Sequence, residues 1–270
     1  MNVQLLVIDP QNDFCDIPGA ALPVPGADAD LQRLARFVEA HAAALSGLTV
    51  TLDSHATVAV ERTTFWLDGG GAAVAPFSFI TAEQVRAGAF RPRDAGLTDA
   101  VLTMLERLAS RGRPGLVVWP VHCVTGTWGH NIHGGLATAL AAWEFGHQRA
   151  VRKVLKGEYP LTEHFGVFEA DAPDPALAST QFNTALAAAL SEGVDLLLIA
   201  GQASSHCVAA SFDQLTAYLD RRPSRPRMVL LRDCMSPVPG FEPLAEALFA
   251  RARAAGAELM TAAEAGELLR

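Results

Sequence analysis

The stretch Asp195–Ser211, DLLLIAGQASSHCVAAS, joins an apolar strand pattern directly to a helical pattern, with a cysteine at the junction. The run Asp195–Ala200 is apolar enough for a strand that is buried on both faces. Ser204 or Ser205 is a residue type that caps helices, so we expect Cys207 in the first helical turn. Free amides and the helix dipole stabilise a thiolate there, which predicts a lowered pKa for Cys207. For this stretch alone, a buried and unreactive thiol is the alternative interpretation.

The same alternation of strand and helix patterns extends along the whole chain. Strands are predicted over Val3–Ile8, Leu48–Leu52, Leu116–Trp119, Ala150–Leu155, Val194–Ala200 and Met228–Leu231, with a weaker one over Glu258–Met260. Helices are predicted over Asp28–Leu45, Thr98–Ser110, Leu136–Phe145, Phe182–Ser191, Ser205–Tyr218, Pro243–Ala255 and Ala262–Leu269. This order predicts a three-layer α/β/α fold with a mostly parallel six-stranded sheet.

Two segments lack this periodicity, residues 54–96 with GGGAA and residues 158–182 with DAPDP. Loops of this length are usually functional lids, contact arms or insertions. Neither an internal repeat nor a clear linker divides the chain. We therefore predict a single domain over residues 1–270, with 54–96 and 158–182 as insertions or long loops.

The composition excludes several classes of protein. The chain has 270 residues and a net charge of −8, which argues against binding the phosphate backbone of nucleic acids. No apolar run approaches the roughly 20 residues of a membrane span, and the N-terminus enters a strand pattern without a targeting signal. The four cysteines lie far apart, so a disulfide framework is not expected. We expect a cytoplasmic protein without nucleic-acid or membrane partners.

Chemically active residue types follow several predicted strands. Parallel α/β sheets bind ligands outside the carboxyl ends of their strands. Asp9, after the first strand, can act as a base in a partly dry pocket, and Lys156 would keep it ionised and favour a thiolate on Cys207. The amides around Ala203 and Cys207 can point at one oxyanion. Each residue alone also has an ordinary interpretation, as a loop acid, a solvated lysine or a core thiol.

A second group suits a metal ion. Asp53 and His55 are separated by one residue in an extended segment, so their side chains point to the same side. A carboxylate and an imidazole suit a zinc-like ion, and His122 in WPVHC would be a third ligand that leaves an open position. A hydrogen-bonded Asp–His pair and a structural loop histidine are the alternatives.

The motifs DPQNDF, LKG and GQASSHCV, in this order, resemble those of the isochorismatase-like cysteine hydrolases, and within them the nicotinamidase branch. The resemblance implies that Asp9 is the catalytic acid/base, Lys156 supports it and Cys207 is the nucleophile. It also implies an oxyanion hole from the amides of Ala203 and Cys207. Family members carry a cis peptide before the alanine, here between Gln202 and Ala203.

TLDSH and WPVHC are similar to the metal motifs of the nicotinamidases. They imply one divalent metal ion on Asp53, His55 and His122, zinc in the first place, with iron and manganese as alternatives. The second histidine of the usual pattern is missing after His55, and Glu61 is a candidate replacement.

The resemblance implies a hydrolase of linear amide C–N bonds that converts nicotinamide and water to nicotinic acid and ammonia, in NAD salvage. The substrate is then a small carboxamide, and homo-oligomerisation stays open. We expect the pocket to include Phe14, Phe65, Trp66, Trp128, Gln202 and His206.

Other functions stay open at this stage. The chain would also suit an amidase for another small amide or ureide, whereas a vinyl ether hydrolase would not need Cys207. A non-catalytic relative that binds a ligand or partner is an alternative of another class. A metalloenzyme in which a zinc-bound hydroxide attacks is a further one.

Overall fold

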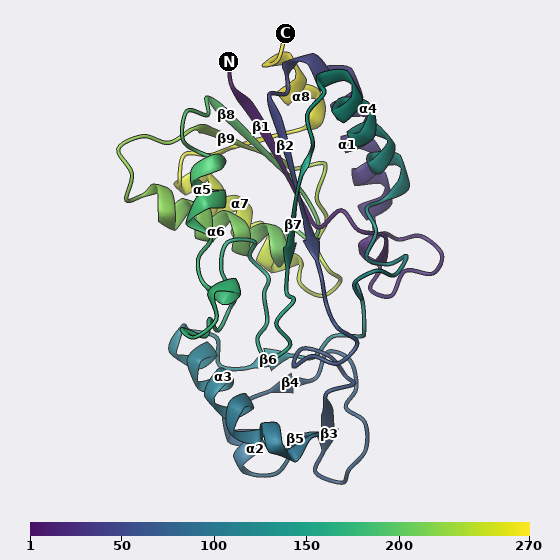
Figure 1. Ribbon diagram of the computed structural model, residues 1–270, viewed down its shortest axis with the longest axis vertical. Coiled ribbons are helices and arrows are strands. Elements are labelled where there is room, and N and C mark those ends of the chain that lie inside the picture. The colour runs from purple at the N-terminus through teal and green to yellow at the C-terminus, as the bar shows by residue number, and fades with distance from the viewer.

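A six-stranded sheet lies at the centre of the protein, and the computed structural model describes all of residues 1–270 (Figure 1). The strand order is β10–β9–β8–β1–β2–β7, and every neighbouring pair is parallel. The strands are β1 Val3–Ile8, β2 Gly47–Asp53, β7 Arg152–Lys156, β8 Leu196–Gly201, β9 Arg227–Leu231 and β10 Glu258–Met260. The predicted fold class is confirmed.

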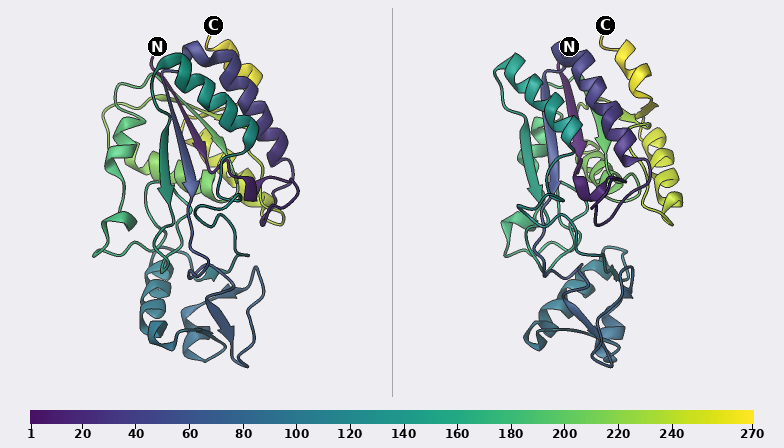
Figure 2. Two further views of the ribbon diagram at one scale, coloured as in Figure 1. Left: turned by 45° about the vertical axis from the view of Figure 1, so that its right-hand side comes forward. Right: turned by 90° about the vertical axis from the view of Figure 1, so that its right-hand side faces the viewer.

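Helices cover both faces of this sheet (Figure 2). One face carries α1 (Ala27–His41), α4 (Gly134–His147) and α8 (Ala262–Glu267), and the other carries α5 (Thr184–Ala189), α6 (Cys207–Leu219) and α7 (Glu242–Ala254). Side chains of a strand point alternately to opposite faces. In β1, Val3, Leu5 and Val7 therefore join the core under α1, while Leu6 and Ile8 join the core under α6.

The predicted strand Leu116–Trp119 does not belong to the central sheet, and this assignment is wrong. Only β6 (Leu116–Val117) forms, and it pairs antiparallel with β4 (Phe79–Ile80). The run is apolar because it packs in a separate core of 13 buried residues together with α3 (Thr98–Ser110). The weaker strand pattern near the C-terminus, β10, completes the central sheet instead.

Residues 54–96 form part of a small lobe rather than an irregular loop (Figure 1, bottom). The lobe contains a second antiparallel pair, β3 (Trp66–Asp68) with β5 (Phe90–Pro92), and the short helix α2 (Ala82–Arg86). Its strands are only two or three residues long, which explains why no periodic signal identified them.

Residues 158–182 are almost free of regular structure, with one short 3₁₀ helix, η4 (Ala178–Thr180). The segment is held against α6, because Ser211 Oγ accepts the amide of Val167 at 3.1 Å and Gln214 Oε1 accepts that of Phe168 at 3.0 Å. The remaining 3₁₀ helices are η1 (Asn12–Phe14), η2 (Ala42–Ala44) and η3 (Ala95–Leu97).

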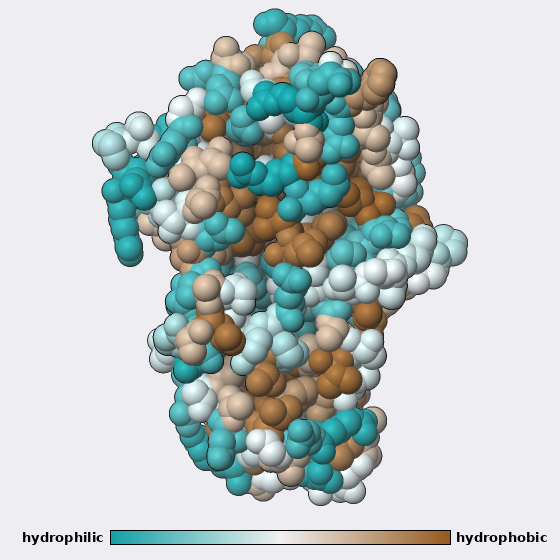
Figure 3. All heavy atoms as spheres, in the orientation of Figure 1, coloured by the Kyte–Doolittle hydropathy of each residue, from teal (hydrophilic) through white to brown (hydrophobic).

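Hydrophilic and hydrophobic residues are interspersed over the face of both the main body and the lobe in Figure 3. None of the helices combines the length and the apolar content that crossing a bilayer requires.

Candidate active site

The carboxyl ends of four adjacent strands, β8, β1, β2 and β7, bring the catalytic candidates together. Lys156, the last residue of β7, is buried, and its side chain lies between the other candidates. Its Nζ is 2.9 Å from Asp9 Oδ2, 2.8 Å from Asp53 Oδ1 and 3.6 Å from Cys207 Sγ. One ammonium group therefore joins the candidate acid, the candidate nucleophile and the first metal-ligand candidate.

Buried charges set the protonation of Asp9 and Lys156. Burial alone would lower the pKa of Lys156, but the carboxylates of Asp53 and Asp9 raise it well above its usual value. Burial raises the pKa of Asp9, against the opposing charge of Lys156 and the hydrogen bond that Thr51 Oγ1 donates to Asp9 Oδ1 at 2.5 Å. Asp9 is thus a stronger base than a free aspartate, held next to a permanent cation.

The predicted lowering of the Cys207 pKa is wrong. Burial raises the pKa of Cys207 well above its usual value, and the charges of Asp9 and Asp53 add to this effect. Lys156 opposes the rise without reversing it. The thiol is therefore protonated at rest, and a reaction at its sulfur needs a base, for which Asp9 is the adjacent candidate.

The predicted serine cap of α6 is also absent. His206 occupies the N-cap position, and no side chain there accepts a helix amide. Ser205 Oγ instead accepts the amide of Val238 at 3.0 Å and lies 2.8 Å from His206 Nδ1, and Ser204 Oγ is buried without a partner. The first amides of α6 are consequently not covered by the preceding serines.

Two amides at this turn are free to meet a ligand. The peptide between Gln202 and Ala203 is cis, as the resemblance implies. The amides of Ala203 and Cys207 donate no hydrogen bond within the chain. The side chain of Gln202 is turned away, bonded to Asp30 Oδ2 and to the amide of Ser236, so its predicted place in the pocket is wrong.

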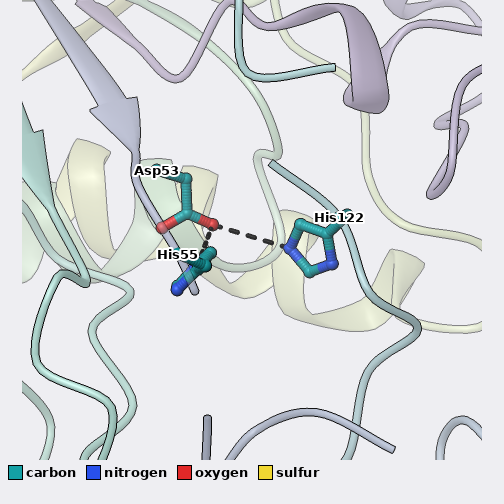
Figure 4. A group of neighbouring side chains, drawn as sticks. All are labelled: Asp53, His55 and His122. Carbon is teal, nitrogen blue, oxygen red and sulfur yellow. Dashed lines mark ion pairs between the residues drawn. The ribbon is translucent and has the colours of Figure 1, made fainter. Parts of the chain in front are cut away.

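Asp53, His55 and His122 converge on one point (Figure 4). Asp53 Oδ2 lies 2.8 Å from His55 Nε2 and 3.6 Å from His122 Nε2, and all three side chains are buried. One ligand atom from each residue lies within 4.8 Å of the others. A carboxylate and two imidazoles at this spacing suit a divalent ion such as zinc, with a position left for another ligand.

The nitrogen of each imidazole that lies away from Asp53 has a polar neighbour of its own. His55 Nδ1 lies 3.1 Å from Glu61 Oε1, and His122 Nδ1 lies 2.8 Å from the carbonyl oxygen of Pro120. Burial and Arg62 lower the pKa of His122 to about 4, so its ring is neutral. Glu61 lies beside this outer nitrogen of His55, where an outer carboxylate would orient the ring, and it is not part of the group of three that converges.

His122 reaches the site from a loop rather than from a sheet strand. Asp13 Oδ2 accepts the amide of Cys123 at 2.7 Å, and the carbonyl of Cys123 accepts the amide of His55 at 3.1 Å. The amide of Thr125 returns a bond to the carbonyl of His55 at 3.0 Å. These bonds hold the loop beside the carboxyl end of β2, although the predicted strand before His122 is not part of the central sheet.

A pocket opens between Cys207 and the three metal-ligand candidates. Its empty space is about 360 Å³, a figure that includes open solvent at its mouth. Phe14 and His206 lie in its wall, as predicted. Sequence analysis missed the other lining residues Leu22, Arg62, Trp119, Glu163, Phe165 and Val238.

The fold of this chain is similar to that of several solved structures. No protein-family model and no curated protein matches the chain. The solved structure of yeast nicotinamidase Pnc1p bound to the inhibitor nicotinaldehyde matches with a TM-score of 0.66 and 17% identity, covering 96% of this chain and 99% of that chain. An isochorismatase-like hydrolase from Alkaliphilus metalliredigens matches with a TM-score of 0.55 and 17% identity, over 100% of both chains. The chain has the isochorismatase-like fold. A third match is the pyrazinamidase of Pyrococcus horikoshii in complex with zinc, with a TM-score of 0.54 and 19% identity, covering 97% of this chain and 99% of that chain.

Three predicted pocket aromatics lie elsewhere in this isochorismatase-like fold. Phe65 and Trp66 are buried in the core of the lobe, because the chain leaves the site after Arg62. Trp128 is 48% exposed and lies against Gly19. Aromatic residues that are close in sequence to a metal motif are therefore not the ones that line the pocket.

Trp119 takes the place of these aromatics. Its Nε1 donates to Glu163 Oε2 at 3.1 Å, and its ring meets those of Phe165 and His206 edge-on. Burial and the charge of Glu61 raise the pKa of Glu163 to about 7. Trp119 stands in the WPVHC motif and could have been found there, whereas Glu163 and Phe165 lie in an irregular segment without any signal.

Proposed function

We propose that the chain is a metal-dependent cysteine amidohydrolase of small carboxamides, with nicotinamide as substrate and nicotinic acid and ammonia as products. The observation that carries the proposal is the buried contact of Lys156 Nζ with both Asp9, at 2.9 Å, and Cys207 Sγ, at 3.6 Å. A yeast nicotinamidase and a pyrazinamidase of Pyrococcus horikoshii with this fold add support.

The first half-reaction forms a thioester. Asp9 takes the proton of the Cys207 thiol, and the sulfur attacks the carbonyl carbon of the amide. The amides of Ala203 and Cys207 donate to the oxygen, which becomes an oxyanion. Asp9 then gives its proton to the departing nitrogen, so that the C–N bond breaks and ammonia leaves.

The second half-reaction releases the acid. Asp9 takes a proton from water, which attacks the thioester carbon, and returns that proton to the Cys207 sulfur as the C–S bond breaks. Lys156 remains an ammonium throughout, since its pKa is raised well above the usual value. Lys156 holds Asp9 in position and lowers the free-energy cost of forming a thiolate at the buried Cys207.

Asp53, His55 and His122 would hold the metal ion, for which zinc is the first candidate. When bound, the ion supplies a Lewis-acidic position that binds a ring nitrogen and so orients the substrate. Phe14 and Trp119 give the pocket aromatic walls against which a flat ring packs.

Ammonia release from purified, zinc-loaded protein tests this function. Nicotinamide should be hydrolysed faster than aliphatic amides and ureides of similar size, since these lack a flat ring. Preference for an aliphatic amide or a ureide would move the assignment to another amidase of this fold. Tight binding of nicotinamide without any ammonia release would favour a non-catalytic binding protein. A role in NAD salvage in the cytoplasm is part of the same proposal.

A further inference from the structure

A buried arginine with free donors lines the pocket. Arg62 is 0% exposed, and it follows Glu61 where the chain enters the lobe. Its Nε and Nη2 have no hydrogen-bond partner. Its Nη1 lies 2.8 Å from His122 Nδ1 and 3.2 Å from His122 Nε2. Two buried guanidinium nitrogens without a hydrogen bond are costly, so an acceptor supplied by a ligand is expected.

The neighbouring carboxylates do not supply this acceptor. Glu61 Oε1 is 3.5 Å from Arg62 Nε and already faces His55, and Glu61 Oε2 forms no hydrogen bond. Glu163 accepts the indole N–H of Trp119 and the amide of His164. Two donors of the guanidinium thus remain for whatever occupies the pocket.

The position of Arg62 fixes which end of a substrate it meets. Arg62 contacts the metal-ligand candidate His122, whereas the proposed function places the scissile amide at Cys207. A guanidinium presents its donors as a planar fork that matches a carboxylate. A neutral acceptor would meet only one of the two nitrogens that lack a hydrogen bond.

We propose that Arg62 is a substrate-recognition residue, and that the pocket accepts small aryl carboxamides with a carboxylate at the end of the ring remote from the amide. This inference rests on the proposed function for the orientation of the substrate, with its amide at Cys207. Glu163 and Asp53 are the acidic groups that line the same pocket and oppose such a ligand. Arg62 provides the attraction that outweighs them.

Binding to an inactive variant tests this inference without turnover. The protein is zinc-loaded Cys207→Ala, and the matched probes are benzamide and 4-carbamoylbenzoate, which lack a ring nitrogen that could bind the metal. Calorimetry should show tighter binding of 4-carbamoylbenzoate by at least about tenfold, as charge-assisted hydrogen bonds give. Arg62→Met in the same background should remove that advantage and bring the affinities for the two probes together.

Three controls keep the result decisive. Zinc content is measured in each variant, and nicotinamide binding reports an intact pocket. Where Arg62→Met does not fold, Arg62→Lys keeps the charge without the fork and should weaken 4-carbamoylbenzoate alone. Equal affinity of Cys207→Ala for both probes, or equal loss of both in the arginine variants, would overturn the proposal. Failure of the proposed amidase function would show separately, as wild-type protein that releases no ammonia.

Discussion

Gly157→Ala tests whether the metal-ligand candidates are placed as the structure shows. Gly157 directly follows Lys156 and has a φ of +80°. A Cβ at this position would lie 2.6 Å from His55 Cε1, 3.0 Å from His55 Nδ1 and 3.4 Å from Asp53 Oδ1. Carbon atoms pack at roughly 3.5–4.0 Å, so the His55 ring would have to move by about 1 Å.

This displacement has a predicted size. Metal sites tolerate deviations of only about 0.2 Å in ligand distances, and disturbing the support of a ligand typically costs about 10- to 100-fold in metal affinity. We therefore expect Gly157→Ala to bind zinc at least about tenfold more weakly and to lose nicotinamide hydrolysis in proportion. The left-handed backbone adds a cost of about 1–2 kcal/mol to the free energy of folding.

Gly256→Ala is the matched control. Gly256 also has a φ of +80°, but no heavy atom lies within 4 Å of a Cβ built there. Both variants should lose similar stability in urea unfolding, and only Gly157→Ala should lose zinc affinity in a competition titration with a chelating dye. Equal zinc affinity and equal turnover in the two variants would refute the placement of His55.

Three further predictions concern the charges and the metal. Lys156→Met leaves two buried carboxylates without their cation, so it should lower the free energy of unfolding by about 3–5 kcal/mol and abolish turnover. Urea unfolding and ammonia assays that show a stable, active variant would contradict this. Burial raises the pKa of Glu163 in the folded protein to about 7, whereas its pKa in the unfolded chain is near 4.5. Glu163 therefore stabilises the fold fully below pH 4.5, and this contribution is lost as the pH rises through 7. Wild-type protein should therefore lose about 3 kcal/mol between pH 4.5 and 8 that Glu163→Gln does not lose, and parallel profiles of unfolding free energy would exclude this. Chelation should raise the KM for nicotinamide far more than that for benzamide, and zinc should restore it; equal effects on both substrates argue against orientation through the ring nitrogen.

The sequence predicted the residues whose position follows from the topology of the sheet. Asp9, Asp53 and Lys156 each stand at the carboxyl end of a strand, and parallel strands present these ends at one edge. Their meeting therefore required only the strand order. Cys207 was located by the same reasoning, but its protonation was not, because its pKa depends on burial and on charges from other strands.

The errors arise where partners are distant in sequence. An apolar run such as Leu116–Trp119 indicates burial, but it does not say in which core the run is buried. Arg62 and Glu163 look like ordinary surface charges in the sequence, and only the lobe and the irregular segment 158–182 bring them to the pocket. Their roles depend on tertiary contacts that no local pattern records.

The most direct test of the account is the rate of ammonia release from nicotinamide by Cys207→Ala, measured beside Cys234→Ala. Both cysteines are buried free thiols, but only Cys207 lines the pocket. The account predicts that loss of the nucleophile lowers the rate at least about a thousandfold, while the Cys234 variant stays close to wild type. A Cys207→Ala protein that folds, binds zinc and still hydrolyses nicotinamide at a rate near that of Cys234→Ala would contradict it.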